Sequence, residues 1–251
     1  MNQTLALAAL LLLLTGCTVI QYPRRWADAP PIPKMTVETA PAPAAPPQEL
    51  PTKTSSKPGA KPPPRVIPPS SEEVEMLLET ARNWVGTRGP LVVEDRRFPF
   101  DCSGFVSALY YQVGIDLFDY GEAPEEDETG SGTEIIYRRL ARSGEVFSKD
   151  PLPGDLVFFD NTWDRDGDGQ VNDTFTHIAV VERVRPSGTV ELLHLGSSGI
   201  GRIHLNLERP GEYRDDKSGE ILNHKLRRKA SGDTDQTPSL TGQLFRAFGR
   251  P

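Results

Sequence analysis

An uneven distribution of proline is the feature that most limits how this chain can fold. Of its 24 prolines, 15 lie between Tyr22 and Ser70, where large apolar residues are scarce. Such a segment buries too little surface to offset the entropy of ordering, and proline biases it towards an extended conformation. We therefore expect residues 17–70 to form a disordered linker and residues 71–251 to form one domain.

The N-terminus has the pattern of an export signal. Leu5 to Leu14 is an unbroken apolar run that is shorter than the roughly 20 residues needed to span a bilayer, so residues 1–16 are interpreted as a cleaved signal peptide. The small residues that precede Cys17 resemble the lipobox of bacterial lipoproteins, although no Lys or Arg stands before the apolar run. This resemblance implies that Cys17 carries acyl chains. An ordinary signal peptide or a short anchor is the alternative.

Thr18, which follows the lipid-attachment cysteine, bears on localisation. In lipoproteins of Gram-negative bacteria, the absence of aspartate at this position points to the outer membrane, so the resemblance implies an anchored protein that faces the periplasm.

The net charge of −7 leaves no basic stripe for phosphate backbones, and nucleic acid is not an expected partner. Cys17 and Cys102 are the two cysteines and have separate explanations, so no disulfide is expected.

The order of the predicted elements indicates an α+β domain. Helical patterns come first, and a strand that follows the Pro153-Gly154 turn begins a series of antiparallel strands. We expect the helices to pack against a small antiparallel sheet or half-barrel. The expected helices are 71–85, 102–114, 133–142 and 240–248, and the expected strands are 155–159, 177–182 and 190–194. The acidic run 122–128 is expected to be a solvated loop, and residues 206–239 are interpreted as a polar insertion.

Cys102 is the first candidate for chemistry. Asp101 is a favourable N-cap, and apolar residues recur at helical spacing after it, so the thiol is expected in the first turn of a helix. A thiol is mostly protonated at neutral pH unless a helix dipole or a histidine favours the thiolate. We interpret Cys102 as a nucleophile. The alternative is a buried structural cysteine.

Two of the four histidines are expected at the same end of the sheet. His177 opens one strand and His194 closes the next, and a hairpin joins the two strands. His177 shares a strand face with Ala179 and Val181, whose small size would admit the start of the Cys102 helix. In that arrangement His177 accepts the thiol proton and His194 orients the His177 ring. Polar strand histidines without a catalytic role are the alternative.

Four sequence blocks together resemble the NlpC-type cell-wall cysteine peptidases, in the order found in that family. This resemblance covers about residues 72–205. It implies a papain-like α+β fold that cleaves peptidoglycan stem peptides, commonly between D-glutamate and a diamino acid, with Cys102 as nucleophile, His177 as base and His194 as the third polar residue. The blocks are Asp-Cys-Ser-Gly-Phe-Val at 101–106, Pro-Gly-Asp-Leu-Val-Phe-Phe at 153–159, Thr-His-Ile-Ala-Val-Val at 176–181 and Leu-His-Leu-Gly-Ser-Ser-Gly-Ile at 193–200.

One departure from the family pattern concerns the oxyanion site. Many members have a tyrosine before the cysteine motif, whereas residues 84–100 contain none, so another donor must serve. Backbone N–H groups at the helix start are the implied donors. Arg88, Arg96 and Arg97 lie in this segment and are candidates to meet substrate carboxylates, although exposed arginines are more often simply solvated.

An acidic, glycine-containing segment matches the first nine positions of a calcium loop. Oxygen ligands fall at positions 1, 3, 5 and 9, and Gly169 falls at position 6. Phe175 replaces the usual glutamate at position 12. We expect a structural Ca²⁺ that supports the strand of His177, and no cofactor in the chemistry itself; a turn that binds nothing is the alternative. The candidate ligands are Asp164, Asp166, Asp168, Gln170, Asn172 and Asp173.

The leading hypothesis is a lipid-anchored cysteine endopeptidase that hydrolyses peptidoglycan stem peptides. An amidase of related fold, which cuts between muramic acid and L-alanine, is the nearest alternative. A non-catalytic lipoprotein that binds peptidoglycan is the third hypothesis. The joint presence of Cys102, His177 and His194 favours an enzyme.

Overall fold

A computed structural model describes residues 68–118 and 129–251. The predicted signal peptide, Cys17, nearly all of the linker and the acidic run 122–128 lie outside these residues. In the described part of the chain, no helix combines the length and the apolar character needed to cross a membrane.

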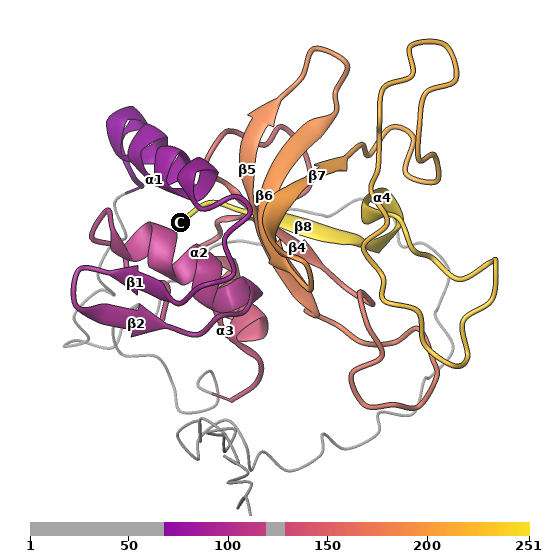
Figure 1. Cartoon of the computed structure of the whole chain (residues 1–251), viewed down its shortest axis with the longest axis horizontal. Helices are drawn as coiled ribbons and strands as arrows, with labels where there is room; N and C mark the ends of the chain where they lie inside the picture. Colours follow the sequence, from indigo (N-terminus) through magenta and orange to yellow (C-terminus); the bar gives the residue numbers. More distant parts are fainter. Residues whose placement is uncertain (1–67, 119–128) are drawn as a thin grey trace, which may run out of the picture. The chain divides into compact units, whose positions relative to one another are not determined.

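The described residues form four helices and eight strands (Figure 1). A two-stranded hairpin precedes α2, and a six-stranded antiparallel sheet has the order β3-β8-β4-β5-β6-β7. This α+β architecture, with helices packed against an antiparallel sheet, confirms the predicted fold class. The helices are α1 (Ser71–Asn83), α2 (Cys102–Tyr111), α3 (Gly132–Arg142) and α4 (Thr241–Leu244), and the strands are β1 (Leu91–Val93), β2 (Arg96–Phe98), β3 (Val146–Phe147), β4 (Leu156–Phe159), β5 (His177–Val184), β6 (Val190–Gly196), β7 (Gly199–Leu205) and β8 (Phe245–Gly249).

Local sequence signals set the starts of the helices. Ser70 and Glu73 form the expected capping box at α1, and the Asp101 carboxylate caps α2 by accepting a hydrogen bond from the Gly104 N–H at 2.8 Å. Each cap satisfies backbone donors that have no partner within the first turn. The N-cap therefore fixes Cys102 as the first residue of α2.

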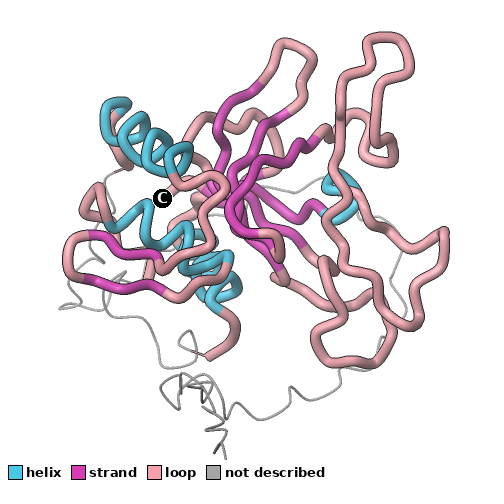
Figure 2. Tube along the Cα trace, in the orientation of Figure 1, coloured by secondary structure: helices cyan, strands magenta, loops and turns pink. Residues whose placement is uncertain are grey.

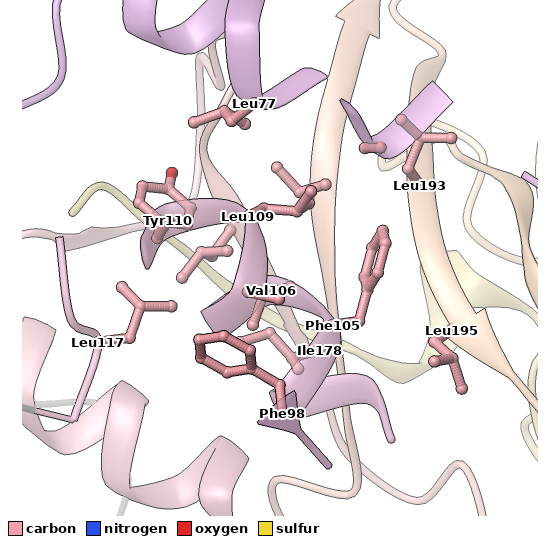
Figure 3. Close-up of a cluster of buried hydrophobic side chains, with 14 of the residues drawn as sticks. Leu77, Phe98, Phe105, Val106, Leu109, Tyr110, Leu117, Ile178, Leu193 and Leu195 are labelled. Carbon is pink, nitrogen blue, oxygen red and sulfur yellow. The ribbon is translucent and has the colours of Figure 1, made fainter. Parts of the chain in front are cut away.

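The two faces of the sheet have separate cores. Helices α1, α2 and α3 cover one face, where Phe105, Val106 and Leu109 of α2 pack against Ile178 and Val180 of β5 (Figure 3). Complete burial of one such side chain contributes about 2 kcal/mol. The opposite face carries a second apolar cluster, formed by Val157, Phe159, Ala179, Val181, Leu192, Ile203, Leu205, Leu244 and Phe248 among others.

This packing corrects one prediction. The Cys102 helix was expected on the face of β5 that carries His177, Ala179 and Val181, but α2 packs on the opposite face, against Ile178 and Val180. Ile178 and Val180 are completely buried there, so the apolar side of the helix packs where it removes these side chains from water.

The C-terminal segment also differs from the prediction. A helix was expected over 240–248, whereas the structure has one helical turn, Thr241–Leu244, followed by the strand Phe245–Gly249. This strand pairs with both β3 and β4 and so lies within the sheet. Pairing on both sides satisfies its backbone groups, which outweighs the local helical pattern.

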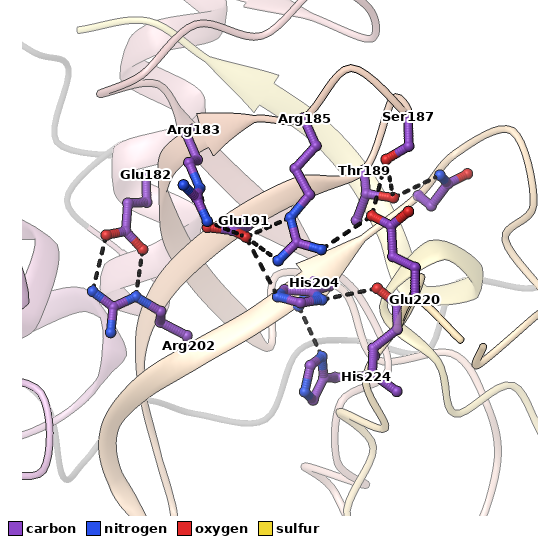
Figure 4. Close-up of polar contacts among 12 residues, drawn as sticks. Glu182, Arg183, Arg185, Ser187, Thr189, Glu191, Arg202, His204, Glu220 and His224 are labelled. Atoms are coloured by element: carbon purple, nitrogen blue, oxygen red, sulfur yellow. Dashed lines mark hydrogen bonds and ion pairs between the residues drawn. The ribbon is translucent and has the colours of Figure 1, made fainter. Parts of the chain in front are cut away.

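The insertion over 206–239 contains neither helix nor strand and runs among the long loops on the side of the sheet away from the helices (Figure 2). Polar contacts nevertheless hold it to the β5–β6 hairpin. Glu220 accepts hydrogen bonds from Arg185 and Ser187, and the His204 ring contacts the carbonyl of Ile221 (Figure 4). The insertion is therefore an ordered part of the domain.

Candidate active site

Cys102 lies partly buried at the N-terminus of α2. The loop before it approaches the helix closely, because a methyl group at Gly104 would overlap the backbone carbonyl of Pro99. Ser103 adds a second contact with the N-cap, since its hydroxyl donates to Asp101 at 2.8 Å. The thiol therefore occupies a turn that is fixed on both sides by short-range contacts.

His177 and His194 are brought together by the sheet, as expected. Nε2 of His177 lies 2.9 Å from Nδ1 of His194, and the rings meet edge to face with their centroids 5.1 Å apart. His177 is buried, whereas His194 is partly exposed. Gly196 makes room for the second ring, because a methyl group at this position would lie 2.8 Å from Cε1 of His194.

One cleft of about 610 Å³ is lined by Cys102, His177 and His194. His177 lies on the face of the sheet opposite to α2, but it is the first residue of β5 and so reaches the cleft at the end of the strand. At this end β5 pairs with β4 alone, because the pairing of β5 with β6 begins only at Val180. Among the described residues, the thiol hydrogen-bonds to Thr133 and not to His177, with 3.9 Å between Sγ and the Thr133 oxygen. The structure thus gathers the three predicted residues without a direct bond between thiol and imidazole.

Thr133 is the site residue that the sequence did not reveal. It is buried in the first turn of α3, whose N-cap is Ser131. The start of α3 lies close against the start of α2, because a methyl group at Gly132 would lie 2.5 Å from the Ser103 hydroxyl oxygen. An N-cap pattern predicts a helix at this position, but no local signal shows that Thr133 contacts the sulfur atom of Cys102, which lies 31 residues earlier in the chain.

Burial shifts the pKa values of both reacting groups. Burial raises the pKa of Cys102, and the Asp101 carboxylate adds to this effect, while hydrogen bonds from the backbone of Ile178 and from Thr133 act in the opposite direction. Burial places the pKa of His177 well below its ordinary value, and His194 lowers it further. Burial also lowers the pKa of His194, to about 4.

The predicted calcium ligands separate into two groups. Carboxylate oxygens of Asp164, Asp166 and Asp173 lie within 4.8 Å of one another and could hold a metal ion. The Asp168 carboxylate instead accepts hydrogen bonds from Gln170 and Asn172 at 2.9 and 3.2 Å. Asp173 is buried, and burial together with the neighbouring carboxylates raises its pKa. A hard cation suits the first group, because it would neutralise charges that now repel one another.

The arginines expected near the substrate are placed elsewhere. Arg96 forms an ion pair with Asp116 at 2.7 Å, and its guanidinium lies over the rings of Phe98 and Tyr111. Arg88 and Arg97 are exposed, and none of the three arginines lines the cleft. The cations that line it come from other segments and are Arg165, Lys225 and Arg228.

A cysteine at a helix start, in one cleft with a pair of histidines on an antiparallel sheet, supplies a nucleophile and a base of the kind that cysteine hydrolases use. The model of the NlpC/P60 family matches residues 83–194, a span that includes Cys102 and ends at His194. Over these residues the chain is therefore similar to the NlpC/P60 family, whose members are generally cysteine peptidases that act on peptidoglycan peptides.

The other comparisons give little beyond the family. A search of curated proteins found no match. The crystal structure of a protein from Staphylococcus aureus subsp. aureus Mu50, described as similar to lipoprotein of the NLP/P60 family, is 19% identical with a TM-score of 0.31. The match covers 57% of this chain and 39% of that protein.

Proposed function

We propose that this chain is a cell-wall cysteine endopeptidase that hydrolyses peptide bonds in peptidoglycan stem peptides, at the bond between D-glutamate and a diamino acid. The observation that carries the proposal is the single cleft lined by Cys102, His177 and His194 within the segment matched by the family. The chemistry proceeds through an acyl-enzyme, because a cysteine nucleophile divides the hydrolysis into two steps.

In the first step Sγ of Cys102 attacks the substrate carbonyl carbon while the thiol proton passes to His177. Nε2 of His177 donates to Nδ1 of His194 in the required tautomer, which leaves Nδ1 of His177 as the basic nitrogen. The negative charge on the carbonyl oxygen is stabilised by backbone N–H groups of the first turn of α2, including that of Cys102.

In the second step His177 returns the proton to the leaving amine, and the peptide bond breaks to leave a thioester on Cys102. Water then attacks the thioester, His177 takes a proton from this water, and the proton passes back to the departing sulfur. His194 acts as a positioning residue, because its contact is with the His177 ring rather than with the reacting atoms.

We further propose that Cys17 carries the lipid that anchors the protein to the outer membrane on its periplasmic side, and that residues 17–70 are the linker to the peptidase domain. A structural Ca²⁺ held by Asp164, Asp166 and Asp173 completes the proposal. These carboxylates are close enough to share an ion, and Asp173 precedes His177 by only four residues. The ion would stabilise the segment that enters β5.

The test uses the purified full chain, defined muropeptides and mass analysis of the products. Cleavage between D-glutamate and the diamino acid is expected, and the Cys102→Ala variant should be inactive while retaining the wild-type melting temperature. Cys17→Ser is the matched control, because it removes the other cysteine and should leave hydrolysis intact. Cleavage between muramic acid and L-alanine would instead identify an amidase, and hydrolysis by Cys102→Ala would exclude the thiol mechanism.

A further inference from the structure

The cleft is positively charged on a protein that is acidic overall. Among the described residues, three cations line it, Arg165, Lys225 and Arg228, and one acidic residue does, Asp101. Arg165 forms an ion pair with Asp173 at 3.8 Å. The Asp101 carboxylate already accepts hydrogen bonds from Gly104 and Ser103 as the N-cap of α2. The chain as a whole has a formal net charge of −7. The cations are therefore concentrated where a substrate would bind, which raises the local affinity for anions.

Two of these cations have no acidic partner among the described residues. Lys225 and Arg228 are exposed, and neither forms a side-chain ion pair or hydrogen bond there. Other arginines of the same insertion are paired, because Arg209 contacts Glu212 and Asp215, and Arg227 contacts Asp233. The two cations that face the cleft thus remain available to a ligand.

The segment that carries these cations is held rigidly. The Arg227 side chain is 1% exposed, binds both carboxylate oxygens of Asp233 and donates to the carbonyl of Asn161 at 2.6 Å. The backbone N–H of Arg228 donates to Thr162 at 2.8 Å. These contacts fix the insertion against the loop after β4, so little ordering entropy would be lost when a ligand binds.

An aromatic ring orients one of the two cations. The guanidinium of Arg228 lies over the ring of Trp163, 5.0 Å from its centroid, and Trp163 also lines the cleft. Stacking of this kind holds the guanidinium plane while its N–H groups stay free to donate. A planar donor fork of fixed direction matches a carboxylate.

We propose that Lys225 and Arg228 bind a free carboxylate of the stem peptide and so determine which peptides are cleaved. We name this pair the basic wall. It lies outside residues 83–194 that the family model matches, and it belongs to the insertion of this chain. The inference rests on the proposed function, since stem peptides with D-glutamate and a diamino acid carry carboxylates that do not take part in the cleaved bond.

The basic wall is tested by comparing two stem peptides, one with free carboxylates and one in which these groups are amides. The double variant K225Q/R228Q should raise KM for the free-carboxylate peptide about three- to tenfold and leave kcat unchanged, because each partly exposed ion pair contributes modestly to binding. KM for the amidated peptide should stay at the wild-type value. K229Q is the matched control, because Lys229 is an exposed cation of the same segment that does not line the cleft.

A binding arm separates failure of this inference from failure of the proposed function. The full chain with Cys102→Ala is titrated calorimetrically with both peptides, with and without K225Q/R228Q. Preference for the free-carboxylate peptide, and its loss in the triple variant, supports the basic wall even if no bond is cleaved. Equal affinity for the two peptides in the Cys102→Ala protein, or a preference that persists without the two cations, overturns it. Melting curves of every variant verify that the fold is intact.

Discussion

A methyl group placed at Gly196 tests whether the contact between the two histidines supports the chemistry. In Gly196→Ala the new methyl would lie 2.8 Å from Cε1 of His194, and an ordinary contact begins at 3.4 Å. The His194 ring must therefore move by about 0.6 Å. A displacement of this size lengthens or bends the 2.9 Å hydrogen bond to Nε2 of His177.

The expected effect on activity follows from that one bond. A neutral hydrogen bond contributes about 0.5–1.5 kcal/mol, so kcat/KM for muropeptide hydrolysis should fall about two- to tenfold. Folding should be nearly unaffected, because Gly196 has no positive φ and no backbone atom is among the nearest contacts of the new methyl. Gly201→Ala is the matched control. Gly201 pairs with His194 across β6 and β7, and a methyl group there would meet nothing within 4 Å.

A double-mutant cycle provides the decisive result. If Gly196→Ala acts through the His194 ring, it should have no further effect once His194 is replaced by alanine, because the displaced ring is then absent. Equal losses of activity in the wild-type and His194→Ala backgrounds would refute the reasoning. So would a Gly196→Ala enzyme with full activity.

Three further predictions concern acid stability, calcium and thiol reactivity. Hydrogen bonds from Arg183 and Arg185 lower the pKa of Glu191 from 4.5 to about 2, so the stability that this carboxylate confers is present above pH 4.5 and disappears towards pH 2. This stability amounts to about 1–2 kcal/mol after discounting for the solvent exposure of Arg183. The free energy of unfolding, measured by urea denaturation, should therefore change less between pH 5 and pH 3 in Glu191→Gln than in wild type. Calcium should raise the melting temperature of the wild type and a chelator should reverse this, whereas Asp173→Asn should not respond; absence of any shift in the wild type would contradict the ion site. The rate at which iodoacetamide alkylates Cys102, followed by peptide mass analysis, should rise with pH, and its midpoint should lie above the pKa of free cysteine because burial raises the pKa of this thiol. Rapid alkylation at pH 6 would contradict a raised pKa.

Short-range signals made the local framework of the site predictable. Asp101 before Cys102 predicts a helix start because its carboxylate caps backbone donors only three residues away. The hairpin between His177 and His194 is predictable because a turn sequence separates two apolar runs. Both signals depend only on neighbours in the sequence and not on the rest of the fold.

The face on which α2 packs was not predictable by the same reasoning. Alternation along β5 correctly separates His177, Ala179 and Val181 from Ile178 and Val180, but it does not say which face receives the helix. That choice depends on the total apolar surface buried by all the helices together. For the same reason Thr133 and the cations of the insertion could not be assigned to the cleft, because their positions depend on long-range packing.

The histidine pair connects the geometry with the chemistry. His177 has a histidine rather than a carboxylate as its hydrogen-bond partner, and burial lowers the pKa of that partner, His194, to about 4. Charge separation develops during attack, when the proton leaves Cys102 and the oxyanion forms beside the helix start. Preorganised donors act most strongly on charge that is absent from the ground state.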